Sequence, residues 1–270
     1  MSAILRTARP GFWSIRGPLS QRHDWILAIA GLVLPLAAWW IVAASGTIEK
    51  VFMPSPGAVW DRAVTWLVED NLSSDMRISI YRVTAGWALS AVIALPLGLM
   101  IGTFRPVQAA LEPLTDFIRY MPAVAFIPLV MLWIGIDEGS KISIIFIGTF
   151  FQMVLMFAED VRRVPLPQIE AAQTMGANRT EIIQLVLLPS AKPALLDTMR
   201  VTMGWAWTYL VVAELVAANS GLGYAILKAR RFLQTDKIFA GIITIGLVGL
   251  ITDQLFRLWH RKAFPWMHLK

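Results

Sequence analysis

The 270-residue chain has no cysteine, only three histidines, and charged residues at only 16% of its positions. Without cysteine it can form no disulfide, no thiolate metal site and no cysteine nucleophile. The histidines, His23, His260 and His268, lie near the polar ends of the chain and have no metal-ligand spacing. No serine or carboxylate pair is placed for nucleophilic or acid–base chemistry. We therefore expect no catalytic residue, no metal site and no enzymatic activity in this chain.

Apolar residues dominate what is present. They make up 57% of the chain, and the mean hydropathy is +0.61, which predicts an integral membrane protein. The formal charge of +6 could suggest a nucleic-acid partner. The basic residues, however, lie between apolar segments and form no single stripe, so they indicate membrane topology and no nucleic acid.

Six apolar stretches approach the roughly 20 residues that cross a bilayer as a helix. The predicted fold is therefore all-α, with spans at about 26–44, 83–103, 111–134, 142–158, 195–217 and 238–259 inside a transmembrane domain of residues 26–260. Tails of residues 1–25 and 261–270 flank it. Six spans put both tails on one side of the membrane. Cationic residues cluster in the tails and between Arg162 and Lys192, so that side is expected to be the cytoplasm.

Two spans contain residues that affect helix packing. Gly86, Gly98 and Gly102 in the second span predict close approach by a neighbouring helix. Pro122 and Pro128 interrupt the third span.

Several polar and aromatic residues lie in or beside the spans and have two interpretations each. Asp116 and Arg119 can pair on one helix face, either in a pathway or at the cytoplasmic boundary. Glu214 can make a packing or gate-loop contact, or couple protons. Trp205, Trp207 and Tyr209 on the fifth span can line a pathway or serve as packing anchors.

A second basic group is expected on the outer side. Lys228, Arg230 and Arg231 can attract an anionic substrate, or they can be a solvated helix end.

A charged, glycine-broken stretch of residues 165–190 separates the fourth and fifth spans. Apolar residues recur at threes before Gly176, which can take the left-handed conformation that ends a helix. Asn178 and Glu181 form a capping-box pattern that starts a second helix, predicted to run until Pro189. The first helix carries an apolar stripe made of Leu166, Ile169, Ala172 and Met175.

This stretch resembles the cytoplasmic loop of permease subunits of ATP-binding cassette importers. The resemblance rests on Glu170-Ala171-Ala172, then Gly176, then Leu188-Pro189. It extends to the segments MPSPGAVW, PAVAFIPLVMLWIGIDEGSK, AELVAANSGLGYAI and FLQTD, which are similar to importers of nitrate, taurine, aliphatic sulfonates and bicarbonate.

The resemblance implies a division of labour. The helix from Leu166 to Met175 would be a coupling helix seated on one of two ATPase subunits, which would hold the ATP and Mg, so this chain needs no cofactor. A binding protein would deliver a small anion, and a second copy of the chain would complete the path as a homodimer in the lipid of a bacterial cytoplasmic (inner) membrane. The residues carried over for ATPase coupling are Glu170, Ala171, Ala172, Gly176, Ala177, Leu188 and Pro189.

Two observations bear on the energy source. The segment GIDEGSK lacks the spacing of a phosphate-binding loop, so this chain is not expected to bind ATP by that motif. An ion-coupled secondary transporter is the alternative, but it should show internal repeats and paired broken helices, and no convincing repeat is found.

Overall fold

The computed structural model describes residues 19–267, apart from the side chains of residues 216 and 217. Within that range the chain is helical and contains no strand. The α-helices are α1 (Gln21–Ala44), α2 (Pro56–Val68), α3 (Leu72–Thr103), α4 (Arg105–Arg119), α5 (Ile127–Ile134), α6 (Glu138–Arg162), α7 (Leu166–Thr174), α8 (Arg179–Glu181), α9 (Leu188–Ala217), α10 (Leu222–Arg231) and α11 (Thr235–Ala263). Short 3₁₀ turns lie at Ala123–Phe126 (η1) and Pro265–Met267 (η3), and Ile182–Leu187 (η2) is a π-helix.

Five of these helices are long and apolar enough to cross a membrane, or six if one bent pair counts as a span. They are α1, α3, α6, the continuous helix from Arg179 to Leu215, and α11. The all-α membrane fold with about six spans is thus confirmed. The helices extend past the predicted spans: α3, for example, begins at Leu72 and not at residue 83.

The third predicted span is not a single helix. Its bent pair consists of α4 and the segment Ala123–Ile134, which meet at an angle of 86°. Pro122 and Pro128 lie at this break and at the start of α5. Because proline supplies no backbone N–H and fixes its own φ, the α4 helix cannot continue in a straight line.

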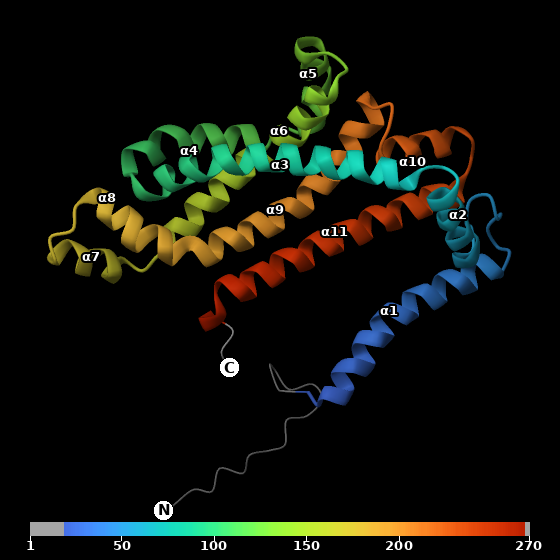
Figure 1. Ribbon diagram of the computed structural model, residues 1–270, viewed down its shortest axis with the longest axis horizontal. Coiled ribbons are helices and arrows are strands. Elements are labelled where there is room, and N and C mark those ends of the chain that lie inside the picture. The colour runs from blue at the N-terminus through green and yellow to red at the C-terminus, as the bar shows by residue number, and fades with distance from the viewer. Residues whose placement is uncertain (1–18, 268–270) are drawn as a thin grey trace, which may run out of the picture.

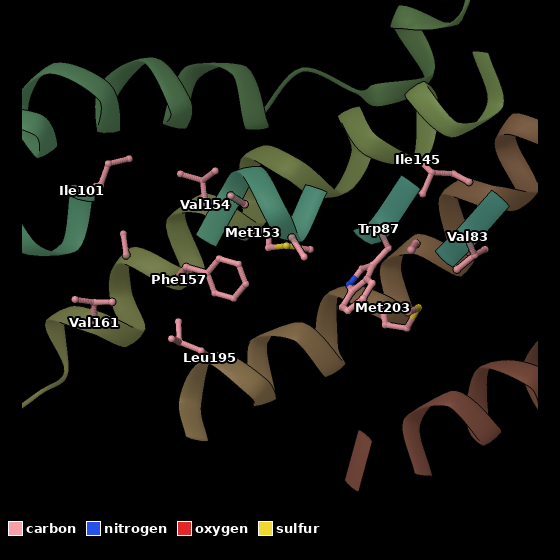
Figure 2. Packing of buried hydrophobic residues seen from close by; sticks show 14 of the residues in the cluster. Val83, Trp87, Ile101, Ile145, Met153, Val154, Phe157, Val161, Leu195 and Met203 are labelled. Carbon is pink, nitrogen blue, oxygen red and sulfur yellow. The ribbon is translucent and has the colours of Figure 1, made fainter. Parts of the chain in front are cut away.

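Helix α3 packs closely along α6, as its glycines predict. A Cβ atom built on Gly98 would lie 2.5 Å from the Cβ of Phe157, and one built on Gly102 would lie 2.7 Å from the carbonyl oxygen of Ala158. Hydrogen atoms at these positions let the two backbones approach. Figure 2 shows the buried core that follows, in which Trp87, Met153 and Phe157 fill the space between α3, α6 and α9.

The bundle has two distinct ends (Figure 1). Helices α7 and α8 form one end, called here the elbow end, and α2 and α10 lie at the opposite end, the far end. Helices α4 and α5 border one long side, while α11 and α1 border the other. Helix α1 leaves its apolar surface exposed and meets α11 where Trp39 stacks on Phe239 at 5.4 Å. Most of the predicted N-terminal tail, residues 1–18, and residues 268–270 of the C-terminal tail lie outside the described residues.

Candidate functional site

The elbow begins with α7, whose end is fixed by a paired hydrogen-bond motif. The Gly176 N–H donates to the Gln173 carbonyl at 2.9 Å, and the Ala177 N–H donates to the Ala172 carbonyl at 3.0 Å. Gly176 has φ +85°, the left-handed conformation predicted for it. These two bonds form a Schellman motif, in which Ala172 and Ala177 occupy the positions that make the accompanying apolar contact. The glycine and both alanines therefore set the elbow angle.

The second arm of the elbow starts at the predicted capping box. The Asn178 Oδ1 accepts from the Glu181 N–H at 3.0 Å, and the Glu181 Oε2 accepts from the Asn178 N–H at 2.8 Å. Two backbone donors at the helix start are satisfied in this way. The capping box is confirmed.

The prediction that this second helix stops at Pro189 is wrong. The helix runs without a break from Arg179 to Leu215, over 37 residues, and passes through the π-helix η2 just before Pro189. There the Leu188 N–H donates to the Ile183 carbonyl, five residues back. This wider turn shifts the hydrogen-bond register, so Pro189 can enter the first turn of α9, where its missing N–H is tolerated. Leu188 and Pro189 therefore join the elbow to a membrane helix and do not end it.

The four apolar residues predicted as one stripe on α7 are divided between a buried side and an exposed side of the helix. Ala172 is buried, and Ile169 is partly buried against η2 and the core. Leu166 and Met175 are 67% and 82% exposed, and Glu170 and Ala171 are also exposed. Of the residues carried over for ATPase coupling, Ala172 is therefore covered by its own chain and is not on the exposed face of α7.

One hydrogen bond ties α7 to α9, and an ion pair joins the neighbouring ends of α6 and α4. The Ser190 hydroxyl of α9 donates to the Gln168 Oε1 of α7 at 3.1 Å. At the end of α6, an Arg162 nitrogen lies 2.9 Å from a Glu112 carboxylate oxygen on α4. The elbow is thus anchored to the helices that it connects.

A cavity of about 290 Å³ lies beside the middle of α9, between α6 and the α4 break. Trp205 and Tyr209 line it, as do Arg119 at the end of α4 and Gln152 on α6. Trp207 does not line this cavity: its side chain is buried in the core, on the side where α11 carries Gly249. The three aromatic candidates therefore divide into two cavity residues and one packing residue.

Asp116 and Arg119 form the predicted pair, with Asp116 Oδ1 2.9 Å from Arg119 Nε. Arg119 also donates to Gln152 Oε1 at 3.4 Å. Gln152 is in the middle of α6, so Arg119 reaches this helix away from the elbow end.

Glu214 belongs to a buried ion network near the far end. Its Oε1 accepts from Arg82 Nη1 at 2.7 Å and from the Ser79 hydroxyl at 2.8 Å. Its Oε2 accepts from the Gly223 N–H at 2.7 Å. Arg82 also binds both carboxylate oxygens of Glu138, at 2.6 and 2.7 Å. This network joins α3, α6, α9 and the start of α10, which gives Glu214 a structural contact and places it outside the cavity beside α9.

Arg230 and Arg231 are exposed in the last turn of α10. They do not line the neighbouring cavity of about 450 Å³, which Lys228 shares with Asp70 and Lys237. Lys237 donates to Asp70 at 2.8 Å, and this hydrogen bond holds the pKa of the Asp70 carboxyl below its usual value. Asp70 therefore pairs with Lys237 and not with Arg230 or Arg231.

Comparison with known proteins decides the family. The family of binding-protein-dependent transport system inner membrane components matches residues 94–264. This chain belongs to that family. It is a multi-pass inner-membrane protein and a permease subunit of an ATP-binding cassette importer. The ion-coupled alternative is not favoured.

Relatives of the permease match along most of its length. A putative aliphatic sulfonates transport permease, SsuC of Bacillus subtilis, is 35% identical over 92% of this chain and 90% of its own. The taurine transport system permease TauC of Escherichia coli is 32% identical over 93% of this chain and 92% of its own. The crystal structure of an amino acid ABC transporter with histidines has the same fold. Its TM-score is 0.60 at 13% identity, covering 70% of this chain and 92% of that chain.

Two residues in these sites were missed by sequence reasoning. Gln152 could have been noticed, because it is an isolated amide in the apolar fourth span. Arg82 lies at the edge of the second span, and its partner Glu214 is 132 residues away. Arg119 was noticed with Asp116, with a pathway position as one of two interpretations.

Proposed function

We propose that α7 is the coupling helix of this permease, and that motion applied to it reaches the substrate path through the continuous helix from Arg179 to Leu215. The observation that carries this proposal is the unbroken connection between the elbow and Trp205 and Tyr209. A short helix can act as a lever only if its junction with the helix that it moves is rigid. The Schellman motif at the end of α7 and the capping box at the start of α8 fix this junction.

The exposed face of α7 is the surface offered to the ATPase. It consists of Leu166, Glu170, Ala171 and Met175. Glu170 would form an ion pair or hydrogen bond with a basic or amide group of the partner, while the apolar side chains fill a groove. ATP and Mg would be held by that partner, since this sequence has no phosphate-binding loop.

A second copy of the chain would complete the path. The cavity beside α9 is lined by the end of α4 and by the segment that leads to α5, and these helices border one long side of the bundle (Figure 1). On that side α5 exposes Leu132 and Trp133, at 78% and 72%. Because one bundle of about six helices encloses only part of a route, we infer a homodimer with the path on its two-fold axis.

The elbow end would face the cytoplasm together with both termini. Basic residues lie at the inner ends of several helices there, and cytoplasmic segments of bacterial membrane proteins favour such residues. They include Arg105, Arg162, Arg163, Arg179 and Lys192 near the elbow, and Arg261 and Lys262 at the end of α11. The far end would then receive the binding protein.

The transported solute would be a small anion. Two relatives named above are permeases for aliphatic sulfonates and for taurine, and both solutes carry a sulfonate group. The binding protein would make most of the selection, so ligand binding to that protein identifies the substrate.

Measuring which energy source drives uptake tests this function directly. Proteoliposomes would contain the permease with its ATPase, ATP enclosed in the lumen, and the loaded binding protein outside. We expect uptake to require enclosed ATP and to persist when a protonophore removes the ion gradient. Vesicles enclosing ADP are the control. Uptake without ATP that follows a proton or sodium gradient would instead establish a secondary transporter.

A further inference from the structure

The cavity beside α9 lies deep within the bundle. Gly148 and Gln152, which line it, are 10 and 14 residues after the start of the 25-residue helix α6. At about 1.5 Å per residue, these positions are about 15 and 21 Å along a helix about 37 Å long. The cavity is therefore close to half-way across the span.

A cationic side chain at this depth needs a physical reason. Arginine near the bilayer centre is energetically costly, and such residues commonly mark solute pathways. The side chain of Arg119 is 28% exposed, and it reaches Gln152 on α6. Its Nη2 donates to the Tyr120 hydroxyl at 3.0 Å, and its guanidinium lies 4.6 Å from the centre of the Tyr120 ring. The α4 break thus holds the charge at the cavity wall.

Other hydrogen-bonding groups converge on the same space. Thr208 and Tyr209 line the cavity, and within the described part of the chain their hydroxyls make no hydrogen bond that would occupy them. The Gln152 amide nitrogen is also free to donate, because only its oxygen is used by Arg119. These groups supply neutral donors around one guanidinium, and Trp205 adds an apolar wall.

Tyr209 is held rigidly in this arrangement. A Cβ atom on Gly148 would lie 2.5 Å from the Tyr209 ring, so the ring rests directly on the α6 backbone. A rigid donor costs less ordering entropy when it binds a ligand.

We propose that this cavity is a transient binding station for the oxyanion group of the transported solute. Arg119 supplies the charge, Gln152, Thr208 and Tyr209 supply hydrogen bonds, and Trp205 contacts the rest of the molecule. Asp116 neutralises Arg119 when the station is empty, which keeps binding weak enough for release, as conduction requires. The inference rests on the proposed function, because it assumes that the cavity belongs to the substrate path.

The test uses the absence of cysteine from the natural chain. A Thr208→Cys variant, assembled with its ATPase in lipid nanodiscs, carries one thiol at the cavity. We expect an anionic sulfonatoethyl methanethiosulfonate to label it at least 10-fold faster than a cationic trimethylammonium analogue of similar size. Adding Arg119→Gln should abolish this preference, whereas adding Arg105→Gln at the other end of α4 should preserve it.

Competition identifies the ligand chemistry. Ethanesulfonate, nitrate and bicarbonate, added separately, should slow labelling by the anionic reagent more than chloride does, and the strongest competitor names the oxyanion. Equal labelling by both reagents, labelling by neither, or no protection by any oxyanion would overturn the proposal. Labelling needs no ATP, so this result is separate from the energy-source test. ATP-driven uptake combined with no anion preference at Thr208→Cys would contradict the oxyanion-binding station and leave the importer function intact.

Discussion

Arg82 and Glu214 form a buried ion pair between residues far apart in the sequence. Both side chains are fully buried, and burying a charge is tolerated only when partners replace water. Here five groups satisfy the Glu214 carboxylate or its partner: the Ser79 hydroxyl, the Glu138 carboxylate, the Ser220 carbonyl, the Ser220 hydroxyl and the Gly223 N–H. The pair fixes the turn between α9 and α10 against α3.

Removing both members of this pair should cost less than the two single losses added together. Arg82→Met should destabilise the protein by about 3–5 kcal/mol, because the buried Glu214 carboxylate loses its cationic partner. Glu214→Met should cost less, because Arg82 keeps its two hydrogen bonds to Glu138. The double variant should lose clearly less than the sum of the single losses. Thermal unfolding in detergent measures all three, and additive losses would contradict a direct coupling between the two side chains.

Local features that depend on residues close together in the chain could be predicted from the sequence. The left-handed Gly176 and the Asn178–Glu181 capping box follow from residues a few positions apart, and the structure has both. The Arg82–Glu214 contact does not follow, since it joins residues 132 positions apart. Its formation depends on how α3 and α9 pack.

Among the elements, the α3–α6 pair is the rigid centre of the bundle. Its glycine contacts could be predicted as a close approach, but the partner helix could not, because a small residue does not specify what packs on it. The α4 break shows the same limit: the sequence contains Pro122 and Pro128, yet the 86° bend depends on where α5 is held.

Close packing makes one α3 glycine intolerant of substitution. Gly98→Ala should destabilise the protein by about 1–3 kcal/mol, because the added methyl overlaps Phe157 and the α6 backbone. Gly246→Ala on α11 is the matched control: nothing lies within 4 Å of its added Cβ, and alanine favours helix. Equal melting temperatures for the two variants would show that α3 and α6 are not in close contact.

Pro189 explains why the helix that follows the capping box was predicted to end too early. A proline commonly ends a helix, but the π-helix η2 lets this one lie inside a continuous segment. A π turn has no simple sequence pattern, so the length of the lever could not be read from the residues. That length is what connects α7 to the cavity beside α9.

For the whole molecule, composition and hydropathy predict the membrane class and about six spans, and the family follows from the elbow motif. The arrangement of the path does not follow from sequence in the same way. Trp205 and Tyr209 line the cavity, whereas Trp207, between them in sequence, is buried in the core. Helical periodicity separates the two faces, but only the packing of α6 and α11 tells which face borders the cavity.

Charge reversal on the exposed face of α7 should uncouple transport without preventing membrane insertion. Glu170→Lys replaces a carboxylate offered to the ATPase with a repelling cation. Uptake should fall at least 10-fold, and binding-protein stimulation of ATP hydrolysis should be lost. Glu69→Lys, an exposed reversal at the far end, should leave ATPase assembly unchanged.

The most direct test of the elbow as the coupling element is the number of solute molecules imported per ATP hydrolysed, measured in proteoliposomes for substitutions of Gly176. Proline cannot adopt φ +85°, whereas asparagine tolerates the left-handed region. No atom lies within 4 Å of a Cβ at this position, so side-chain bulk does not separate the two substitutions. They differ in backbone conformation and in the N–H that donates to the Gln173 carbonyl, which asparagine keeps and proline lacks. We predict that Gly176→Pro lowers this ratio at least 10-fold, while Gly176→Asn keeps at least half of it. A wild-type ratio for Gly176→Pro, with normal stimulation of ATP hydrolysis by the binding protein, would contradict the coupling role of the elbow.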